Sequence, residues 1–366
     1  MTRTSDLPAN RRDGISWIVA KCLLLAVSTS LFAGHASAVE DETEIPVIPE
    51  WLQDRMTLRV SNRRDNGDMI ALVRPLSESI GDSVVQVVSD GKPIALGVIL
   101  TPDGYVLTKR SELSGDPIRV RLADGRLQPA RVAAVRRRND LALLRIEGIS
   151  EPLPAAKLVD IAPPIGSFLI SAGRGGTPVG LGVVGVKLRK VAPNGRLGVV
   201  LQDQEGQVTV SGVWPDSGAD NAGVVPGDRI LAINGRSEVS RSSVIGRLRE
   251  IFPGENVRLT ILRGSEKLEM NAKIHELGIM EESENDSKVN GPRSTRLSGF
   301  EQVIQHDTVL NPDECGGPIV DTKGRFIGIN IARAGRVVSF ALPASVVIPD
   351  LESMLNEAHG NVVTTP

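Results

Sequence analysis

Short apolar runs separated by turn residues occupy most of the chain after residue 83. Residues 84–88 and 141–146 are mostly apolar, and residues 118–122 alternate apolar with charged positions. Runs of this length, bounded by pairs such as Asp90-Gly91 and Asp124-Gly125, are typical of β-strands and tight turns. Many short strands at this spacing predict an antiparallel barrel or sandwich.

Helical periodicity is confined to a few places. Residues 69–79 predict a short helix just before the strand-rich region. Near the other end, residues 344–357 place Val347, Leu351 and Leu355 on one stripe, as in an amphipathic helix. We therefore expect a mainly β chain with a C-terminal helix, followed by a tail over residues 358–366.

The first 38 residues have the pattern of an export signal. Arg11 and Arg12 precede an apolar run over residues 22–34, which ends in Ala36-Ser37-Ala38. That run is shorter than the about 20 residues needed to span a bilayer, and the small residues at its end suit a signal peptidase. We expect a cleaved signal, with an uncleaved anchor as the alternative, and a mature protein in the periplasm or cell envelope. Residues 39–75, charged and interrupted by prolines, predict a loose N-terminal arm.

Composition and charge narrow the classes of function. Hydrophobic residues make up 41% and charged residues 23%, a mix typical of a globular chain. The balance of 42 Lys+Arg against 44 Asp+Glu, with an aromatic content of 3%, argues against nucleic acid as a partner. Cys22 lies in the signal, so Cys315 is left without an internal disulfide partner. The sequence has no metal-ligand cluster, phosphate loop or dinucleotide fingerprint, so we expect no metal, no cofactor and, after the signal, no membrane span.

Residues 189–276 have a different texture. They contain Ser217-Gly218-Ala219 and the run PGDRILAING over residues 226–235, and apolar residues within 244–251 share one helical face. This segment resembles a bacterial PDZ domain, which implies binding of an extended peptide C-terminus as an added strand. The alternatives are a turn without a ligand and a domain that only braces its neighbour. By the same resemblance, the peptide would contact a carboxylate loop, the strand after it and the helix: Gly195, Arg196, Leu197, Gly198, Val199, Val244 and Leu248.

Three blocks in the strand-rich regions carry a second resemblance. They are residues 103–108 (DGYVLT), 139–146 (NDLALLRI) and 311–320 (NPDECGGPIV). In order and spacing these blocks resemble the trypsin-like domain of the HtrA/DegP family of exported serine proteases, which implies a double antiparallel β-barrel. In that family the PDZ domain follows the protease domain, whereas here it would separate residues 76–188 from residues 299–357. Residues 277–298, which lack apolar periodicity, are expected to be a flexible linker.

The triad positions implied by this resemblance are degenerate. The family's aspartate matches Asp140, but Ser111 stands at its histidine position and Cys315 at its serine position. A hydroxyl does not act as a base near neutral pH, and an unassisted thiol, with a pKa of about 8.5, is only slightly ionised there. The oxyanion loop carries Asp313 and Glu314 in place of Gly-Asn, and two carboxylates would oppose an oxyanion and raise the thiol pKa. We expect the ordinary catalytic machinery to be absent.

Three hypotheses follow. The first is an exported pseudoprotease of envelope protein quality control that binds polypeptide C-termini, unfolded proteins or active HtrA relatives. The second is an endopeptidase in which Cys315 attacks, with His306 or a histidine of another subunit as the base. The third is an architectural protein with a blocked groove. Cys315 itself is open to a role in the core or as a redox-sensitive thiol, and homo-oligomerisation is left open.

Overall fold

The computed structural model describes residues 66–113, 115–204, 206–238 and 240–360. The expected signal segment lies outside these residues, as do residues 39–65 of the expected arm and residues 361–366 of the tail. In the described part of the chain, no helix combines the length and the apolarity needed to cross a membrane.

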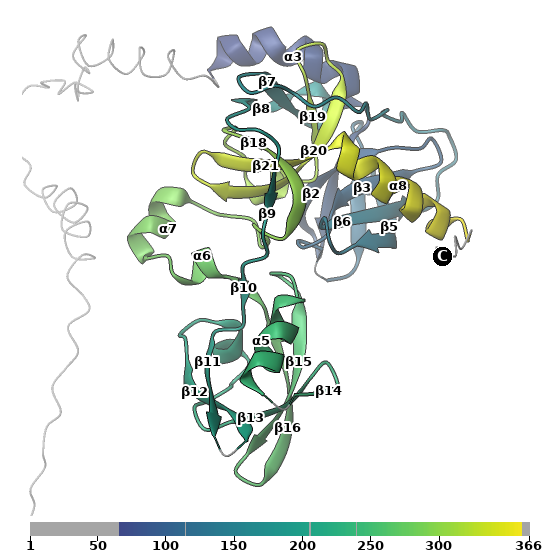
Figure 1. Ribbon diagram of the computed structural model, residues 1–366. Coiled ribbons are helices and arrows are strands. Elements are labelled where there is room, and N and C mark those ends of the chain that lie inside the picture. Colours follow the sequence, from purple (N-terminus) through teal and green to yellow (C-terminus); the bar gives the residue numbers. More distant parts are fainter. Residues whose placement is uncertain (1–65, 114, 205, 239, 361–366) are drawn as a thin grey trace, which may run out of the picture. The chain divides into compact units, whose positions relative to one another are not determined.

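Six strands form a closed antiparallel barrel at the start of the described region (Figure 1). They follow the order β1-β2-β3-β6-β5-β4, and the pairing of β1 with both β2 and β4 closes the sheet. Val85, Val87 and Val106 are fully buried and pack together in its core. The strands are β1 Val84–Ser89, β2 Lys92–Ile99, β3 Tyr105–Lys109, β4 Ile118–Arg121, β5 Leu127–Arg136 and β6 Leu141–Ile146.

A second antiparallel sheet has seven strands in the order β8-β7-β19-β20-β21-β18-β9. An isolated bridge between Val184 and His306 joins the chain after β8 to β18, so the run from β8 to β18 closes on itself. The two sheets confirm the mainly β double barrel expected from the sequence. The strands are β7 Phe168–Ala172, β8 Pro178–Val183, β9 Arg189–Val191, β18 Phe300–His306, β19 Pro318–Val320, β20 Phe326–Gly335 and β21 Val338–Pro343.

The helix expected before the first strand is α3 (Gly67–Gly81). It begins at Asn66, whose side chain accepts a hydrogen bond from the main-chain N–H of Met69 at 2.9 Å, as an N-cap does. It buries Val73 and Ile80 and contacts β7 and β8 of the second sheet. The helix therefore anchors the start of the described chain to the second barrel.

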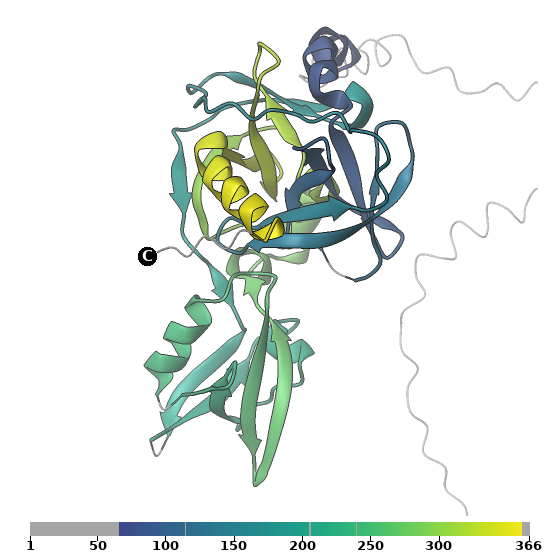
Figure 2. The ribbon, with the colours of Figure 1, turned by 90° about the vertical axis from the view of Figure 1, so that its right-hand side faces the viewer.

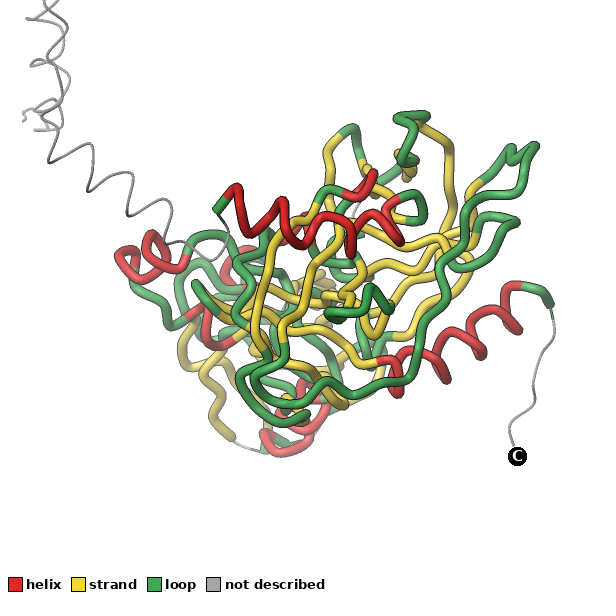
Figure 3. The backbone as a smooth tube through the Cα atoms, turned by 90° about the horizontal axis from the view of Figure 1, so that it is seen from above, coloured by secondary structure: helices red, strands yellow, loops and turns green. Residues whose placement is uncertain are grey.

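The C-terminal helix is α8 (Ala344–Ala358), which lies along β5 of the first barrel (Figure 2). Val347 is fully buried and Leu351 and Leu355 are half-buried against the core, as the predicted stripe requires. The Arg136 guanidinium at the end of β5 pairs with Glu357 at 2.9 Å. Figure 3 shows this helix on the outside of the strands, leading to the C-terminus. It therefore ties the end of the second barrel back to the first.

The chain between β9 and β18 contains an inserted domain, which we define as β10 to β17 (residues 195–276). Its main sheet follows the path β11-β12-β13-β15-β16 with β14 beside β13, and its buried apolar residues form a cluster of their own. Val191 of β9 lies opposite Phe300 of β18, so the chain leaves and re-enters the second sheet at neighbouring strands. The elements are β10 Gly195–Arg196, β11 Val199–Gln204, β12 Gln207–Val213, α4 Gly218–Asn221, β13 Arg229–Ile233, β14 Arg236–Ser237, α5 Arg241–Arg249, β15 Asn256–Arg263, β16 Glu266–Lys273 and β17 His275–Glu276.

Residues 277–298 differ from the flexible linker expected from their composition. They form two short helices, α6 (Leu277–Met280) and α7 (Glu284–Asn290), and then an extended stretch that contacts the barrels. Ser294, Arg296 and Ser298 in this stretch are buried. Apolar periodicity was absent because this stretch is held by hydrogen bonds and ion pairs instead of an apolar face.

Candidate functional site

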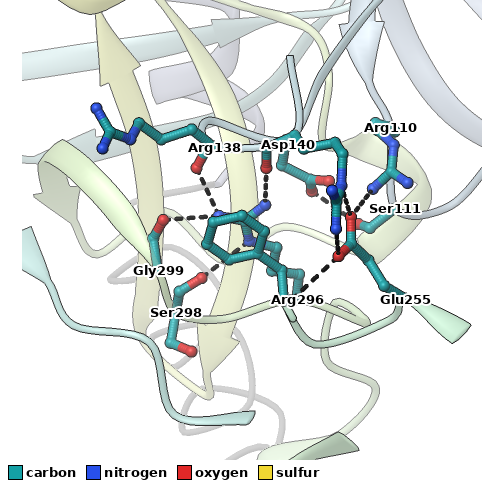
Figure 4. Close-up of polar contacts among 10 residues, drawn as sticks. Arg110, Ser111, Arg138, Asp140, Glu255, Arg296, Ser298 and Gly299 are labelled. Carbon is teal, nitrogen blue, oxygen red and sulfur yellow. Dashed lines mark hydrogen bonds and ion pairs between the residues drawn. The ribbon is translucent and has the colours of Figure 1, made fainter. Parts of the chain in front are cut away.

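The positions of the family's histidine and aspartate lie together. The Ser111 hydroxyl donates a hydrogen bond to Asp140 Oδ2 at 2.7 Å (Figure 4). Asp140 is fully buried in the turn between β5 and β6, and its Oδ1 has no hydrogen-bond partner among the described residues. Burial raises the pKa of Asp140, against the opposing charges of Lys109 and Arg296. Ser111 thus keeps the hydrogen bond to the aspartate but offers no group that takes up a proton near neutral pH.

The position of the family's nucleophile is sealed. Cys315 follows the short 3-10 turn Pro312–Glu314 and is 0% exposed. Among the described residues, its sulfur has two hydrogen-bond partners, the Ser294 hydroxyl at 3.8 Å and the Asn311 carbonyl at 3.7 Å. Burial raises the pKa of the Cys315 thiol, with Lys109 opposing the shift. A buried thiol with a raised pKa is a poor nucleophile.

The oxyanion loop, residues 311–315, makes hydrogen bonds within itself. The Cys315 main-chain N–H, the group that would face an oxyanion, donates to the Pro312 carbonyl at 3.3 Å. The Glu314 carboxylate accepts from the Asn311 N–H at 2.6 Å, and burial, with a contribution from the charge of Asp313, raises the pKa of Glu314. The sequence predicted a raised thiol pKa because of Asp313 and Glu314, but the main cause is burial of the sulfur, and the carboxylate that contributes is Glu112.

His306, the candidate base of the endopeptidase hypothesis, lies on β18 and is buried. Its Nδ1 is 2.8 Å from the Thr308 hydroxyl. Neither partner of the Cys315 sulfur is an imidazole.

A buried ion pair next to these positions was missed by the sequence reasoning. Lys109, at the end of β3, is 0% exposed, and its Nζ lies 3.0 Å from Glu112 Oε1. Burial opposes the charge, but Glu112 and the neighbouring acidic groups outweigh it and raise the pKa of Lys109. Glu112 also accepts hydrogen bonds from the Thr295 N–H at 3.0 Å and hydroxyl at 2.9 Å. The sequence did contain a signal for this ion pair: Lys109 ends an otherwise apolar strand, and Glu112 follows three positions later.

Arg296 fills the space beneath the Asp140 turn. It is 1% exposed and donates hydrogen bonds to the carbonyl oxygens of Arg137, Arg138 and Gly299 (Figure 4). Its guanidinium also stacks on the Phe252 ring, 4.0 Å from the centroid. With the bond from its Nε to the Ser298 carbonyl, the guanidinium makes four hydrogen bonds to main-chain oxygens, so its role here is structural. It joins the stretch after α7 to the turn that carries Asp140.

Glu255, in the loop after α5, connects the inserted domain to the first barrel. Its carboxylate lies 2.9 Å from Arg110 and makes two hydrogen bonds with Arg137, at 2.7 and 2.5 Å (Figure 4). Burial opposes its charge, but the bonds and charges of these arginines outweigh burial and lower the pKa of Glu255. Arg110 directly precedes Ser111, so this junction adjoins the hydrogen bond between Ser111 and Asp140.

The inserted domain has a groove of ≈ 260 Å³ between its edge strand β11 and helix α5. Gly198, with a φ of 89°, closes the loop at one end, where a Cβ would lie 2.1 Å from the Ser217 Cβ. Six of the seven predicted peptide contacts line the groove. Val244 differs, because it is fully buried in the domain core, and Ile245 takes its place. The lining residues are Gly195, Arg196, Leu197, Gly198, Val199, Leu201, Ile245, Leu248 and Arg249.

No metal site was expected from the sequence. Within residues 66–360 as described, there is no group of three or more His, Cys, Asp or Glu side chains that could hold a metal ion.

Comparison with known proteins gives a family model for the inserted domain and several relatives for the chain. Residues 195–274 match the model of the PDZ domain family. The chain is 28% identical over 130 residues to serine endoprotease DegS of Escherichia coli K12, a match that covers 36% of this chain and 34% of DegS. It is 29% identical over 114 residues to serine protease HTRA3 of Mus musculus, covering 31% of this chain and 23% of HTRA3.

A further relative is named as a probable membrane transporter, whereas DegS and HTRA3 are named as serine proteases. The chain is 28% identical over 75 residues to the probable membrane transporter protein MamO of Paramagnetospirillum magneticum, covering 20% of this chain and 12% of MamO. The match to DegS spans about a third of that protein's length.

The fold and the groove define a trypsin-type double barrel that carries a PDZ domain. The chain is HtrA-like, since it combines this PDZ domain with homology to the HtrA and DegS serine proteases.

Proposed function

We propose that this protein is an HtrA-like pseudoprotease, which binds polypeptide C-termini through its PDZ groove and does not cleave them. The observation that carries the proposal is the state of residue 315. Its thiol is fully buried, and its partners are a serine hydroxyl and a carbonyl instead of an imidazole.

The expected loss of turnover can be estimated from the groups that are missing or engaged. Removing the base or the nucleophile of a triad lowers turnover on the order of 10⁶-fold. An oxyanion hole that has lost a donor removes roughly a further 10²- to 10³-fold, and here the Cys315 N–H is engaged by Pro312. These effects together leave no useful rate for peptide hydrolysis.

The groove supports the binding half of the proposal. β11 is the edge of its sheet, so its outer main-chain groups are available to an added strand. Leu197, Val199, Leu201 and Ile245 provide an apolar lining, and Arg196 lies beside the loop that would receive the terminal carboxylate. Such a surface suits an extended peptide with an apolar C-terminal residue.

We also propose export to the periplasm or cell envelope, on the pattern of residues 1–38, and a role there in protein quality control. The partners would be unfolded chains, or active HtrA relatives, and association with further copies of the chain belongs to the same proposal. MamO, a relative named as a transporter and not as a protease, accords with a family member that does not hydrolyse peptides.

The catalytic half is tested by incubating the purified protein with casein and with an unfolded protein, beside a Cys315→Ala variant. Neither protein is expected to degrade these substrates. Turnover that is present in the wild type and abolished by Cys315→Ala would show an endopeptidase.

The binding half is tested by titrating a library of C-terminal peptides. Ile245→Lys places a charge in the groove and is expected to weaken binding at least about tenfold, equivalent to about 1.4 kcal/mol. Gly246→Lys is the matched control, because Gly246 is the next residue of the same helix, is exposed and does not line the groove. Absence of any saturable binding would favour the architectural hypothesis, and equal effects of the two variants would place the ligand elsewhere.

A further inference from the structure

The stretch over residues 291–298, which we name the strap, lies directly over Cys315. Its Ser294 hydroxyl contacts the Cys315 sulfur at 3.8 Å. Ser294 also makes two hydrogen bonds with Arg333 of β20: its main-chain N–H donates to the Arg333 carbonyl at 3.1 Å, and its side-chain hydroxyl accepts from the Arg333 N–H at 3.0 Å. Two hydrogen bonds therefore join the strap to Arg333, beyond the part of β20 that pairs with β19.

The next strap residue reaches the other barrel. Thr295 donates two hydrogen bonds to Glu112, one from its N–H and one from its hydroxyl, and Glu112 is held in turn by buried Lys109. Burial opposes the charge of Glu112, but Lys109 and the Thr295 donors outweigh it and lower the pKa of Glu112. Hydrogen bonds to a charged acceptor are stronger than neutral ones, so Glu112 is a strong attachment point for the strap on the first barrel.

The far end of the strap is fixed to the inserted domain. The Leu297 N–H and the Ser298 hydroxyl both donate to the Glu276 carboxylate, at 2.6 and 2.8 Å. Arg296, which lies between Thr295 and Leu297 in the sequence, donates a hydrogen bond to the Arg138 carbonyl in the turn that carries Asp140. Each strap residue from 294 to 298 thus has a polar anchor outside the strap.

The inserted domain also approaches the strap and position 111. A Cβ built on Gly254 would lie 2.8 Å from Thr295 Cγ2 and 3.7 Å from the Ser111 Cβ, so the backbone at Gly254 lies close to both residues.

We propose that the strap is an intramolecular occupant of the cleft between the two barrels, which it closes over Cys315 in the place of a bound polypeptide. Glu112 belongs to the first barrel and Arg333 to the second, and the strap binds both. A substrate would then be kept from Cys315 by the strap, in addition to the replacement of the family's histidine and serine. This closure is separate from the PDZ groove, so a failure of its test leaves the proposed peptide binding unaffected.

The test measures how fast iodoacetamide alkylates Cys315 in the full chain, with mass spectrometry to separate Cys315 from Cys22. Thr295→Val keeps the side-chain shape and removes one hydrogen bond to charged Glu112. It is expected to open the strap and to increase the alkylation rate about ten- to hundredfold. Thr322→Val, at an exposed threonine in the turn between β19 and β20, is the matched control and is expected to change nothing.

A second variant and a second measurement test strap opening independently of Thr295 and of the thiol. Ser294→Ala, which removes the hydroxyl between Cys315 and Arg333, is expected to act in the same direction. Amide hydrogen exchange of the peptide that contains residues 291–298 reports opening without depending on the thiol's ionisation, and it should accelerate in both variants while the β20 peptide stays protected. Rates equal to those of Thr322→Val, in alkylation and in exchange, would show that the barrels and not the strap bury Cys315.

Discussion

Restoring the family's residues at the triad is expected not to restore a protease. The perturbation is the double substitution Ser111→His and Cys315→Ser, with Asp140 left in place. If a missing base and nucleophile were the sole defects, turnover should increase on the order of 10⁶-fold. The contacts around residue 315 lead us to expect an increase of less than about tenfold.

The difference comes from distances in the cleft. A substrate carbonyl must approach the nucleophile to roughly 3–3.5 Å, but the Ser294 hydroxyl already lies 3.8 Å from the Cys315 sulfur, and the residue is 0% exposed. The main-chain donor that should stabilise the oxyanion is bound to Pro312, which costs roughly 10²- to 10³-fold.

The assay is hydrolysis of quenched fluorescent casein, together with labelling by a fluorophosphonate, which reacts with an activated serine. DegS, a relative named as a serine endoprotease, is the positive control. Circular dichroism and peptide titration establish that the variant folds. A gain above about 10³-fold, or stoichiometric fluorophosphonate labelling, would refute the reasoning that the cleft is occupied.

Three further outcomes follow from other contacts. Glu255→Gln removes the charge that joins Arg110 to Arg137, and because Arg137 is half exposed we expect a loss of about 2 kcal/mol in the free energy of unfolding, read from urea titration. Burial of Asp228 opposes its charge, but two hydrogen bonds from Arg263 and one from the Val225 N–H outweigh it and lower the pKa of Asp228. The stabilisation from the ionised Asp228 carboxylate is complete above the unfolded pKa of about 3.9 and is lost as the pH falls through the lower native pKa. Asp228→Asn should therefore destabilise the protein at pH 7 by about 1–3 kcal/mol and make its stability depend less on pH below pH 4. An unchanged pH dependence of unfolding below pH 4 would contradict this. Gly198→Ala should lower peptide affinity at least about tenfold because its Cβ meets Ser217, whereas Gly206→Ala, also at positive φ but with open space around it, should not, and calorimetry distinguishes the two.

The barrels and the PDZ domain could be predicted because their signals are local. Several strands are short apolar runs, such as residues 141–146, and turn residues with positive φ, such as Asp90 and Gly91, separate neighbouring strands. The replacement of the family's histidine by Ser111 and of its serine by Cys315 was equally visible, since a motif names the residue that stands in it. The choice between Val244 and Ile245 was not, because adjacent residues of an amphipathic helix border both the core and the groove.

The closure over Cys315 had no local signal. Residues 291–298 are polar and aperiodic, a composition typical of linkers, and their partners Glu112 and Glu276 lie up to 183 positions away. Their order comes from charged acceptors and main-chain oxygens that the barrels bring together only after folding, as for Arg296 beneath the Asp140 turn. Residue identity predicted a site without a proton shuttle, whereas the burial of its thiol depends on long-range hydrogen bonds, which pattern and spacing do not encode.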